Sequence, residues 1–573
     1  MTDSRRAQAA PPTSARPLGV CAALICAAIG GFLAFLAFPG YNQWYLMPIS
    51  VAFLSAASHV RSRFLTAICG LVWGLSFFIP LLSWTGVYVG VEPWLALAAV
   101  ESLFMMVLAL LMRPVLLRRT PGWVSAMTVG GLWTACEFAR SSVPFGGFPW
   151  GTTAFSQADS PLLAFAPWIG MGGFAFLVGG AGHLLYVGAI SLLKRRGEGF
   201  NGLYGLWAWA VCAVIVVVSI VTPMPRDVAP HNRSTVTVAG IQGNTTSSGL
   251  RMGERPGEIL DNHASLTEKY AEELKDRGKT VDFMVWPENA SDLQPARNLY
   301  ARNRIQEAVD AAGVPVFVGA QKYTADDQHR FNTLQLWEPD KGMVNSYSKQ
   351  HPVPFGEYIP FRSFFRSLSS KVDLVPVDML PGTSVGVMDV AGTKAGLLIC
   401  FEIAYESLVQ DTVKSGAQIL LVPTNTALFG TTDESVQQLA ESQVMAAISG
   451  RSVVHISTVG ISAMITPDGR IISSSGHWTP EVLESTLPLR TGITPAIAAG
   501  PWIYIGASAL GLAGLAGALS RPNPYRRAAR KTASSPQPPR KDNRSRKTGT
   551  SHKHNGQRRM KTIIASDSRE DSR

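Results

Sequence analysis

The stretch Gly396-Leu397-Leu398-Ile399-Cys400-Phe401-Glu402 decides the fold of the globular part of this chain. Its short apolar run is typical of a buried strand, and a cysteine stands at its end. A rigid sheet often aims catalytic side chains into a cleft from such positions. Cys400 is the only one of the six cysteines outside the strongly apolar regions of the chain. A thiol without a disulfide partner in its own region suggests a reactive nucleophile.

The region around this strand, 223–498, alternates β-rich apolar runs with helical patterns. Strands are expected at Thr235–Ile241, Asp282–Trp286, Val314–Gly319, Thr333–Trp337, Ala395–Cys400, Gln418–Val422, Val453–Thr458 and Ser462–Thr466. Helices are expected at about 256–276, 298–312, 405–416 and 433–449. This alternation predicts one α/β domain in which layered sheets are covered by helices. A domain of about 275 residues can form a core without disulfides.

Apolar residues concentrate on either side of this domain. A membrane span needs roughly 20 mostly apolar residues. The candidates are about 18–38, 43–58, 64–84, 94–112, 122–140, 163–193, 202–222 and 499–519. The sequence therefore predicts a seven-helix membrane domain over 18–222 and an eighth transmembrane helix at 499–519. Polar residues within these spans need partners. Arg140 lies three residues after Glu137 and is expected to pair with it, whereas Glu101 has no evident partner. His183 fits a position at the membrane interface.

Basic residues set the orientation of these spans. Arg and Lys occur in the loops after spans two, four and six and in the segment 1–17, whereas the alternate loops carry almost none. This pattern places 1–17 in the cytoplasm and the domain 223–498 on the extracytoplasmic side of the cell membrane. A cleaved signal peptide is the alternative for the first span, but six further spans follow it and no A-x-A-like cleavage site stands out.

The C-terminal segment 520–573 accounts for the net charge of +11. It carries 16 Lys and Arg against 4 Asp and Glu, and it is rich in Ser, Pro and Asn. Such a composition indicates a disordered basic tail, which suits a cytoplasmic position near anionic lipid head groups. Nucleic-acid binding is not expected, because no fold presents these charges.

Three polar residues stand at the ends of expected strands: Glu288, Lys349 and Cys400. A carboxylate can take the thiol proton, the thiolate can attack an acyl carbon, and an ammonium can stabilise the resulting oxyanion. Taken singly, each residue has a simpler explanation: a core cysteine, a turn carboxylate and a solvated lysine. The residues alone therefore leave the acyl-enzyme chemistry open.

Several longer segments carry a family resemblance. They are Ile241-Gln242-Gly243-Asn244, Trp286-Pro287-Glu288, Tyr347-Ser348-Lys349 followed by 351–360 (HPVPFGEYIP), Ile399–Ile403, and Gly147-Phe148-Pro149-Trp150 in the apolar region. Together they resemble the nitrilase superfamily, and within it the apolipoprotein N-acyltransferases, its membrane-embedded branch. The resemblance covers about residues 18–519. It implies a multi-span helical membrane domain joined to an extracytoplasmic nitrilase-like domain, an αββα sandwich.

The resemblance also implies roles for site residues. Glu288 is expected to be the general base, Lys349 the oxyanion partner and Cys400 the nucleophile. The supporting residues implied are Glu357, Phe401 and Glu402. Candidates for lipid or substrate contact are Trp150, Phe361, Phe364, Phe365, Leu428 and Phe429. No cofactor is expected, and no metal-binding pattern of Cys and His occurs in the outer domain.

Some positions depart from the family pattern. The family commonly has Asn-Asp-Ala/Gly-Trp-Phe where this chain has Asn425-Thr426-Ala427-Leu428-Phe429, so an aspartate and a tryptophan are missing. Phe401 replaces the usual tyrosine after the nucleophile. None of these changes removes a member of the expected triad, and the missing aspartate and tryptophan concern the loop where lipid contact is expected.

The reaction implied is a two-step acyl transfer. A membrane phospholipid donates an acyl chain to Cys400, and the thioester then acylates the α-amino group of the S-diacylglyceryl cysteine of an apolipoprotein. Two alternatives stay open at this point. One is a membrane-tethered amidase that uses water as acceptor, and the other is a non-catalytic membrane scaffold that retains the domain.

Overall fold

The computed structural model describes residues 18–118, 120, 122–193, 202–225, 234–246 and 255–521. The predictions for the segment 1–17 and for the tail beyond Arg521 lie outside the described residues. The same holds for the basic residues that follow the sixth expected span.

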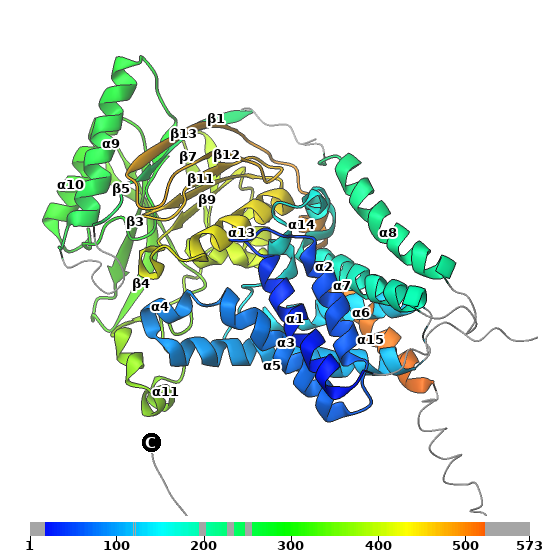
Figure 1. Cartoon of the computed structure of the whole chain (residues 1–573). Helices are drawn as coiled ribbons and strands as arrows, with labels where there is room; N and C mark the ends of the chain where they lie inside the picture. The colour runs from blue at the N-terminus through cyan, green and yellow to red at the C-terminus, as the bar shows by residue number, and fades with distance from the viewer. Residues whose placement is uncertain are drawn as a thin grey trace, which may run out of the picture. The chain divides into compact units, whose positions relative to one another are not determined.

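Apolar helices occupy all eight positions where membrane spans are expected (Figure 1). They are α1 (Val20–Leu36), α2 (Leu46–Ser58), α3 (Arg63–Leu81), α5 (Val91–Leu117), α6 (Gly122–Arg140), α7 (Ala166–Leu193), α8 (Gly202–Val221) and α15 (Trp502–Ser520). Among the described residues, four helices are long and apolar enough to cross a membrane: α3, α5, α7 together with the turn before it, and α15. The apolar helices α1 and α2 and the described part of α8 are shorter. Membrane crossing by the remaining helices stays a prediction.

The buried charges of this region pair differently from the prediction. Arg140 on α6 forms an ion pair with Glu101 on α5, with 3.0 Å between Nη1 and Oε2, and both side chains are buried. Glu137 instead accepts hydrogen bonds from Trp133 Nε1 (3.0 Å) and from the backbone N–H of Thr153 (2.9 Å). The predicted Glu137–Arg140 pair is therefore wrong. A buried charge needs a partner, and Glu101 on the neighbouring helix supplies it to the Arg140 guanidinium.

His183 also differs from the prediction of an interfacial residue. It is 1% exposed, and its two ring nitrogens lie 3.1 Å from Ser55 Oγ and 3.1 Å from Ser125 Oγ. The imidazole therefore joins α7 to α2 and α6, because each polar atom of a buried ring needs a hydrogen-bond partner.

The outer domain contains two β-sheets. The first has the strand order β13-β1-β2-β3-β4-β5, with β6 paired to β4, and the second has the order β12-β11-β10-β9-β8-β7. The strands of the first sheet are β1 (Thr235–Gln242), β2 (Phe283–Val285), β3 (Val316–Tyr323), β4 (His329–Glu338), β5 (Gly342–Ser348), β6 (Asp378–Met379) and β13 (Glu481–Pro488). Those of the second are β7 (Val387–Val390), β8 (Thr393–Leu397), β9 (Ile419–Thr424), β10 (Ser452–Ser457), β11 (Ala463–Ile465) and β12 (Ile471–Ser474).

Helices cover the outer face of each sheet, which confirms the predicted αββα sandwich (Figure 1). Apolar residues of both sheets, such as Phe317 and Leu421, form one buried core between them. The helices α9 (Glu258–Asp276) and α10 (Leu299–Ala312) pack on the first sheet. The helices α12 (Glu406–Lys414) and α13 (Glu434–Ser449) pack on the second. All four helices lie where the sequence predicts them.

The α12 and α13 layer also contacts the apolar helices. One continuous cluster of buried apolar side chains runs from α3 and α7 into α12 and α13. Gln437 on α13 donates a hydrogen bond to the backbone oxygen of Leu81, at the end of α3 (3.4 Å). The side of the sandwich that carries the Cys400 loop is therefore fixed against the membrane helices.

Candidate active site

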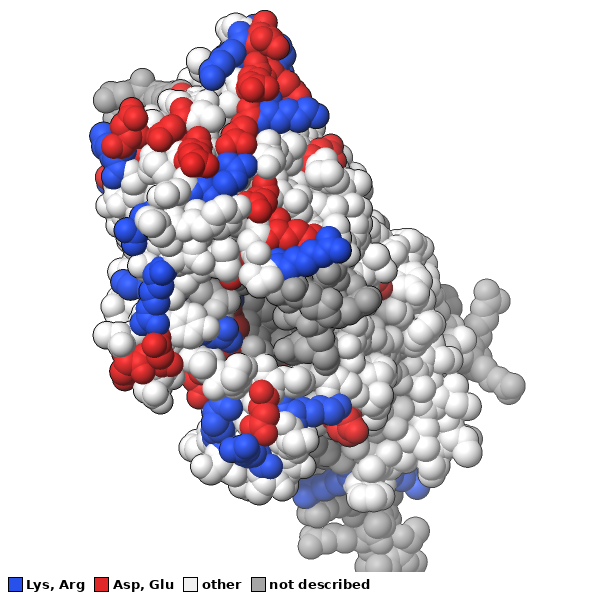
Figure 2. All heavy atoms as spheres, turned by 90° about the vertical axis from the view of Figure 1, so that its left-hand side faces the viewer, with Lys and Arg blue, Asp and Glu red and all other residues white. Residues whose placement is uncertain are grey.

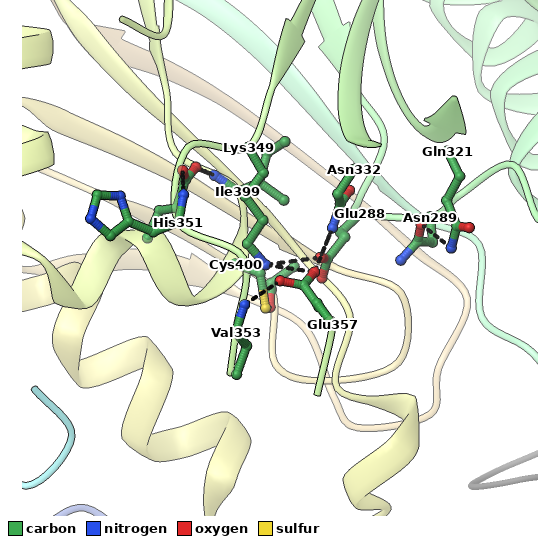
Figure 3. A network of polar contacts seen from close by, with 12 residues as sticks. Glu288, Asn289, Gln321, Asn332, Lys349, His351, Val353, Glu357, Ile399 and Cys400 are labelled. Atoms are coloured by element: carbon green, nitrogen blue, oxygen red, sulfur yellow. Dashed lines mark hydrogen bonds and ion pairs between the residues drawn. The ribbon is translucent and has the colours of Figure 1, made fainter. Parts of the chain in front are cut away.

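The predicted site residues come together from both sheets (Figure 3). Glu288 follows β2, Lys349 follows β5, and Cys400 opens the 3-10 helix η5 (Cys400–Ala404) after β8. Backbone packing holds Glu288 tightly, because a Cβ at Gly319 on β3 would lie 2.1 Å from the carbonyl oxygen of Pro287. The turn that presents Glu288 thus depends on a residue without a side chain on the neighbouring strand.

Cys400 lies just beyond the strand rather than at its last residue. The strand predicted at Ala395–Cys400 ends at Leu397, although Leu398 still donates a backbone hydrogen bond to Leu421 (3.0 Å). Cys400 itself has a φ of +55°. A residue with a side chain rarely adopts this conformation, which costs about 1–3 kcal/mol and is common at functional sites. The turn directs the thiol toward Glu288 and Lys349 (Figure 3).

Lys349 lies between two carboxylates. Its Nζ is 2.9 Å from Glu357 Oε1 and 3.6 Å from Glu288 Oε1, and the side chain is 1% exposed. Burial lowers the pKa of Lys349, but the charges of Glu357 and Glu288 outweigh burial and hold it above its ordinary value. The ammonium is therefore charged at neutral pH.

Asn332 completes this arrangement and was not predicted from the sequence. It precedes the expected strand Thr333–Trp337, and its backbone oxygen accepts a hydrogen bond from the Lys349 N–H (2.9 Å). Its side-chain Nδ2 donates to Glu288 Oε1 (2.6 Å) and to Glu357 Oε1 (3.0 Å). One amide therefore positions both carboxylates around the ammonium.

The protonation states favour a resting thiol with a base beside it. Burial, and then the charge of Glu288, raise the pKa of the Cys400 thiol, against the opposing charge of Lys349. Burial also raises the pKa of Glu288, while Lys349 and hydrogen bonds from Asn332 and Cys400 act in the opposite direction. A neutral thiol cannot attack a carbonyl efficiently. The cysteine therefore has to lose its proton to a neighbouring group during the reaction.

Two further donors contact the sulfur. Thr424 Oγ1 on β9 lies 3.4 Å from Cys400 Sγ, and Gln438 Nε2 on α13 lies 3.3 Å from it. Both residues are fully buried. Neither was predicted, because a threonine in a strand and a glutamine in a helix have no signature of their own. Their hydrogen bonds favour a thiolate and fix its direction.

Glu402, predicted as a supporting residue, joins the cysteine loop to the lysine loop. Its carboxylate accepts hydrogen bonds from the backbone N–H groups of Ile399 (2.7 Å) and Gln350 (2.7 Å) and from Tyr347 Oη (3.0 Å). Burial raises the pKa of Glu402 to about 7, although Lys349 and the backbone donors lower it. The contacts give Glu402 a positioning function for the segments that carry Lys349 and Cys400.

Phe401 and Trp150 form a stack between the domain and the membrane helices. Their ring centroids are 5.3 Å apart with 8° between the planes. Trp150 is 1% exposed, and its Nε1 donates to Gln437 Oε1 (2.6 Å). Protein side chains therefore cover the ring in this structure, and contact of Trp150 with lipid or substrate stays a prediction.

The other candidates for lipid contact divide into two groups. Phe361 and Phe364, at the start of α11 (Arg362–Leu368), are 73% and 59% exposed, whereas Phe365 is half-buried. Leu428 and Phe429 are half-buried, and Phe429 contacts Trp84. Figure 2 shows charged side chains at the lower end of the molecule, where Figure 1 places α11, as well as over its upper part. Exposed aromatic residues beside charges suit a membrane interface, so α11 fits this prediction better than the 428–429 loop does.

Two family models match this chain. Residues 30–184 match the apolipoprotein N-acyltransferase N-terminal domain, and residues 238–493 match the carbon-nitrogen hydrolase domain. Among solved structures, an amidase from Nesterenkonia sp. has a TM-score of 0.33 and 18% sequence identity, over 45% of this chain and 92% of its own. Nit3 of Saccharomyces cerevisiae, a member of the nitrilase superfamily, has a TM-score of 0.34 and 16% identity, over 47% and 94%.

Full-length relatives agree with both family models. An apolipoprotein N-acyltransferase from Mycolicibacterium smegmatis is 36% identical over 84% of this chain and 82% of its own length. The apolipoprotein N-acyltransferase of Photobacterium profundum is 26% identical over 84% of this chain and 92% of its own. The chain therefore belongs to the apolipoprotein N-acyltransferase family, and it is an acyltransferase whose nitrilase-like domain is joined to a helical membrane domain.

Proposed function

We propose that this protein transfers an acyl chain from a membrane phospholipid, through a thioester on Cys400, to the α-amino group of an S-diacylglyceryl cysteine at the start of an apolipoprotein. The observation that carries the proposal is the buried meeting of three groups: the thiol of Cys400, the carboxylate of Glu288 and the ammonium of Lys349. The family membership supplies lipoprotein acylation as the reaction class.

In the first half-reaction, Glu288 takes the proton from the Cys400 thiol as the sulfur attacks the ester carbonyl carbon of the phospholipid. Lys349, with backbone N–H groups near Cys400, stabilises the oxyanion that forms. The tetrahedral intermediate then breaks its bond to the glycerol oxygen, which receives the proton from Glu288. A lysophospholipid leaves, and the acyl chain stays on the sulfur.

In the second half-reaction, the acceptor amine attacks the thioester carbonyl. The same oxyanion site stabilises the second tetrahedral intermediate. The carbon–sulfur bond breaks, an N-acyl amide forms, and the thiolate regains a proton through Glu288. Thr424 and Gln438 stabilise the departing thiolate, because they already donate toward the sulfur.

A phospholipid donor is consistent with the surroundings of the site. The apolar cluster that surrounds Phe401 is continuous with the membrane helices. The exposed Phe361 and Phe364 lie at the start of α11, and Arg366 on this helix and Lys371 just after it form ion pairs with Asp373 and Glu92. Such a segment can bind the surface of a bilayer, where acyl chains are concentrated.

The helix ends support an extracytoplasmic position for the active site. Arg113 near the end of α5 donates to the Val60 backbone oxygen (3.2 Å), and Arg118 donates to that of Ala518 on α15 (2.9 Å), so basic residues gather at one end of these helices. The opposite end of α5 faces the domain, because Glu92 pairs with Lys371 (2.8 Å). Basic loops stay in the cytoplasm. We therefore assign 18–222 and 499–519 to the cell membrane and 223–498 to its outer side.

A fluorescent phospholipid tests the proposal. The purified protein should acquire a fluorescent adduct that hydroxylamine removes, and the Cys400→Ser variant should acquire none of this kind. A diacylglyceryl peptide should then discharge the adduct and become fluorescent. Release of free fatty acid without peptide labelling would indicate a hydrolase, and the absence of any adduct in the wild type would refute the thioester mechanism.

A further inference from the structure

The inner face of α13 presents an acid that the reaction described above does not use. Glu434, the first residue of α13, is 3% exposed, and its Oε2 has no hydrogen-bond partner. A buried carboxyl oxygen without a partner is costly and calls for a functional explanation. The helix start that carries it favours negative charge.

Glu434 lies close to the reacting groups. It is four residues before Gln438, whose amide touches Cys400 Sγ at 3.3 Å, and residues at i and i+4 lie on the same face of a helix. Its charge acts on the thiol of Cys400 and is itself influenced by Glu288. The Glu434 side chain therefore leaves α13 on the same face as Gln438, whose amide contacts the sulfur.

The loop before α13 adds a second polar atom without a partner. Thr426 Oγ1 is buried and makes no hydrogen bond. A Cβ placed on Gly460 would lie 2.5 Å from Thr426 Oγ1 and 2.6 Å from Ser435 Oγ, so Thr426 is close to the residue that follows Glu434. The loop before α13 and the start of the helix therefore carry two buried oxygens without hydrogen-bond partners, Glu434 Oε2 and Thr426 Oγ1, and together they suit a group that donates several hydrogen bonds.

We propose that Glu434 binds the α-ammonium group of the acceptor and takes one of its protons before acyl transfer. This inference rests on the proposed thioester mechanism and deepens it, because it names the subsite of the second substrate. An ammonium group offers three donors and a positive charge, which match the unpaired oxygens of Glu434 and Thr426. The phospholipid, which carries an ester at its reacting end, has no need of this acid.

The protons balance as follows. The acceptor arrives as R–NH₃⁺, because an α-amino group has a pKa of about 7.7–8.0. The Glu434 carboxylate removes one proton and leaves the neutral amine, whose nitrogen then attacks the thioester. A second proton passes from this nitrogen through Glu288 to the departing sulfur. The proton on Glu434 returns to solvent, so that one proton is released for each amide formed.

Burial explains how Glu434 stays ready for this step. Burial, and then the charge of Glu288, raise the pKa of Glu434 to about 8. An incoming ammonium favours the ionised form of a neighbouring carboxyl. Binding of the acceptor therefore drives the carboxyl proton of Glu434 to solvent, and the remaining carboxylate, whose pKa burial keeps close to that of the α-amine, can take a proton from the bound ammonium.

Separate measurement of the two half-reactions tests this inference. Wild-type protein, Glu434→Gln and Glu441→Gln are loaded with fluorescent phospholipid, and the acyl-enzyme is then mixed with a diacylglyceryl peptide that has a free α-amine. Glu441 is the control for loss of a buried acid from the same helix, because it is 1% exposed and also has an unpartnered Oε2. The variant Glu434→Asp keeps the acid and should retain part of the discharge rate.

We expect Glu434→Gln to retain thioester formation, because Glu288 and Lys349 stay in place, while peptide discharge slows by about 100-fold, the lower end of a general base's contribution. Hydroxylamine, which is neutral at pH 7, should discharge all acyl-enzymes equally. Peptide discharge at the wild-type rate in Glu434→Gln would overturn the inference, and so would equal loss of both half-reactions, which would make Glu434 a structural residue. A wild type that forms no thioester would instead refute the proposed function itself.

Discussion

The substitution Asn332→Asp tests the electrostatics of the site most sharply. The Asn332 side chain is 2% exposed, and its Nδ2 donates to Glu288 Oε1 at 2.6 Å and to Glu357 Oε1 at 3.0 Å. Aspartate has nearly the same shape but places an oxygen where the amide donates. The substitution therefore removes two hydrogen bonds and adds a third acid beside Glu288 and Glu357.

The expected shift follows from the lost hydrogen bond. A hydrogen bond to a charged group contributes about 1.5–3 kcal/mol, and 1.36 kcal/mol corresponds to one pKa unit. Loss of the bond to Glu288 alone should therefore raise the pKa of Glu288 by about one to two units. Repulsion from the new carboxylate acts in the same direction.

The sign of the effect on activity is clear. Glu288 accepts the thiol proton only when ionised, so activity is present above its pKa and is lost as the pH falls through it. Burial already raises this pKa in the wild type, which places the acid limb of the profile above the ordinary glutamate value of about 4.3. In Asn332→Asp the acid limb should move to still higher pH.

The assay is the rate of fluorescent thioester formation as a function of pH. Asn345→Asp, the same exchange at an exposed position on β5, is the control and should leave the acid limb in place. An acid limb that stays unchanged in Asn332→Asp, or that moves equally in the control, would refute the role of Glu288 as the base.

Three further predictions concern charge and packing. Lys349→Met keeps the length of the side chain but removes the ammonium between the two active-site carboxylates, so thioester formation should fall by about 10²–10³-fold in the adduct assay. Trp150→Ala removes the stack and the hydrogen bond that join the domain to the membrane helices, so the free energy of unfolding should fall by about 3–5 kcal/mol, seen as a lower thermal midpoint. The control Trp123→Ala, at an exposed position, should change the midpoint little. Glu101→Gln leaves a buried guanidinium without its charge partner and should destabilise by about 3–5 kcal/mol. The control for Glu101→Gln is Glu92→Gln, which lies in an exposed ion pair and should leave the thermal midpoint nearly unchanged.

The periodic elements were predictable because their patterns are local. The helices α9, α10, α12 and α13 and the buried strands around Cys400 have strong apolar periodicity, and their ends lie close to the predicted ones. The strands β7, β12 and β13 were missed; all three lie at sheet edges, and β12 exposes most of its residues. Edge strands of this kind depend on pairing with a neighbour, which no local pattern reports.

The site was predictable only where a long motif marks it. Glu288, Lys349 and Cys400 stand in such motifs, and the structure brings them together. Asn332 and Gln438 were missed, because each acts through a contact with a residue from another element. The ion pair of Arg140 was assigned to the wrong glutamate for the same reason, since a neighbour on the same helix is visible in the sequence and one on another helix is not.

The position of the transferred acyl group tests the central claim most directly. Wild-type protein loaded with phospholipid can be digested, and the modified peptide can be identified by mass spectrometry. The account predicts one acyl chain on the peptide that contains Cys400. When a diacylglyceryl peptide is added, this acyl chain should leave Cys400 at the same rate as the N-terminal cysteine of the added peptide gains its mass. An acyl chain on a different residue, or acylation of the peptide at full rate by the Cys400→Ser variant, would contradict it.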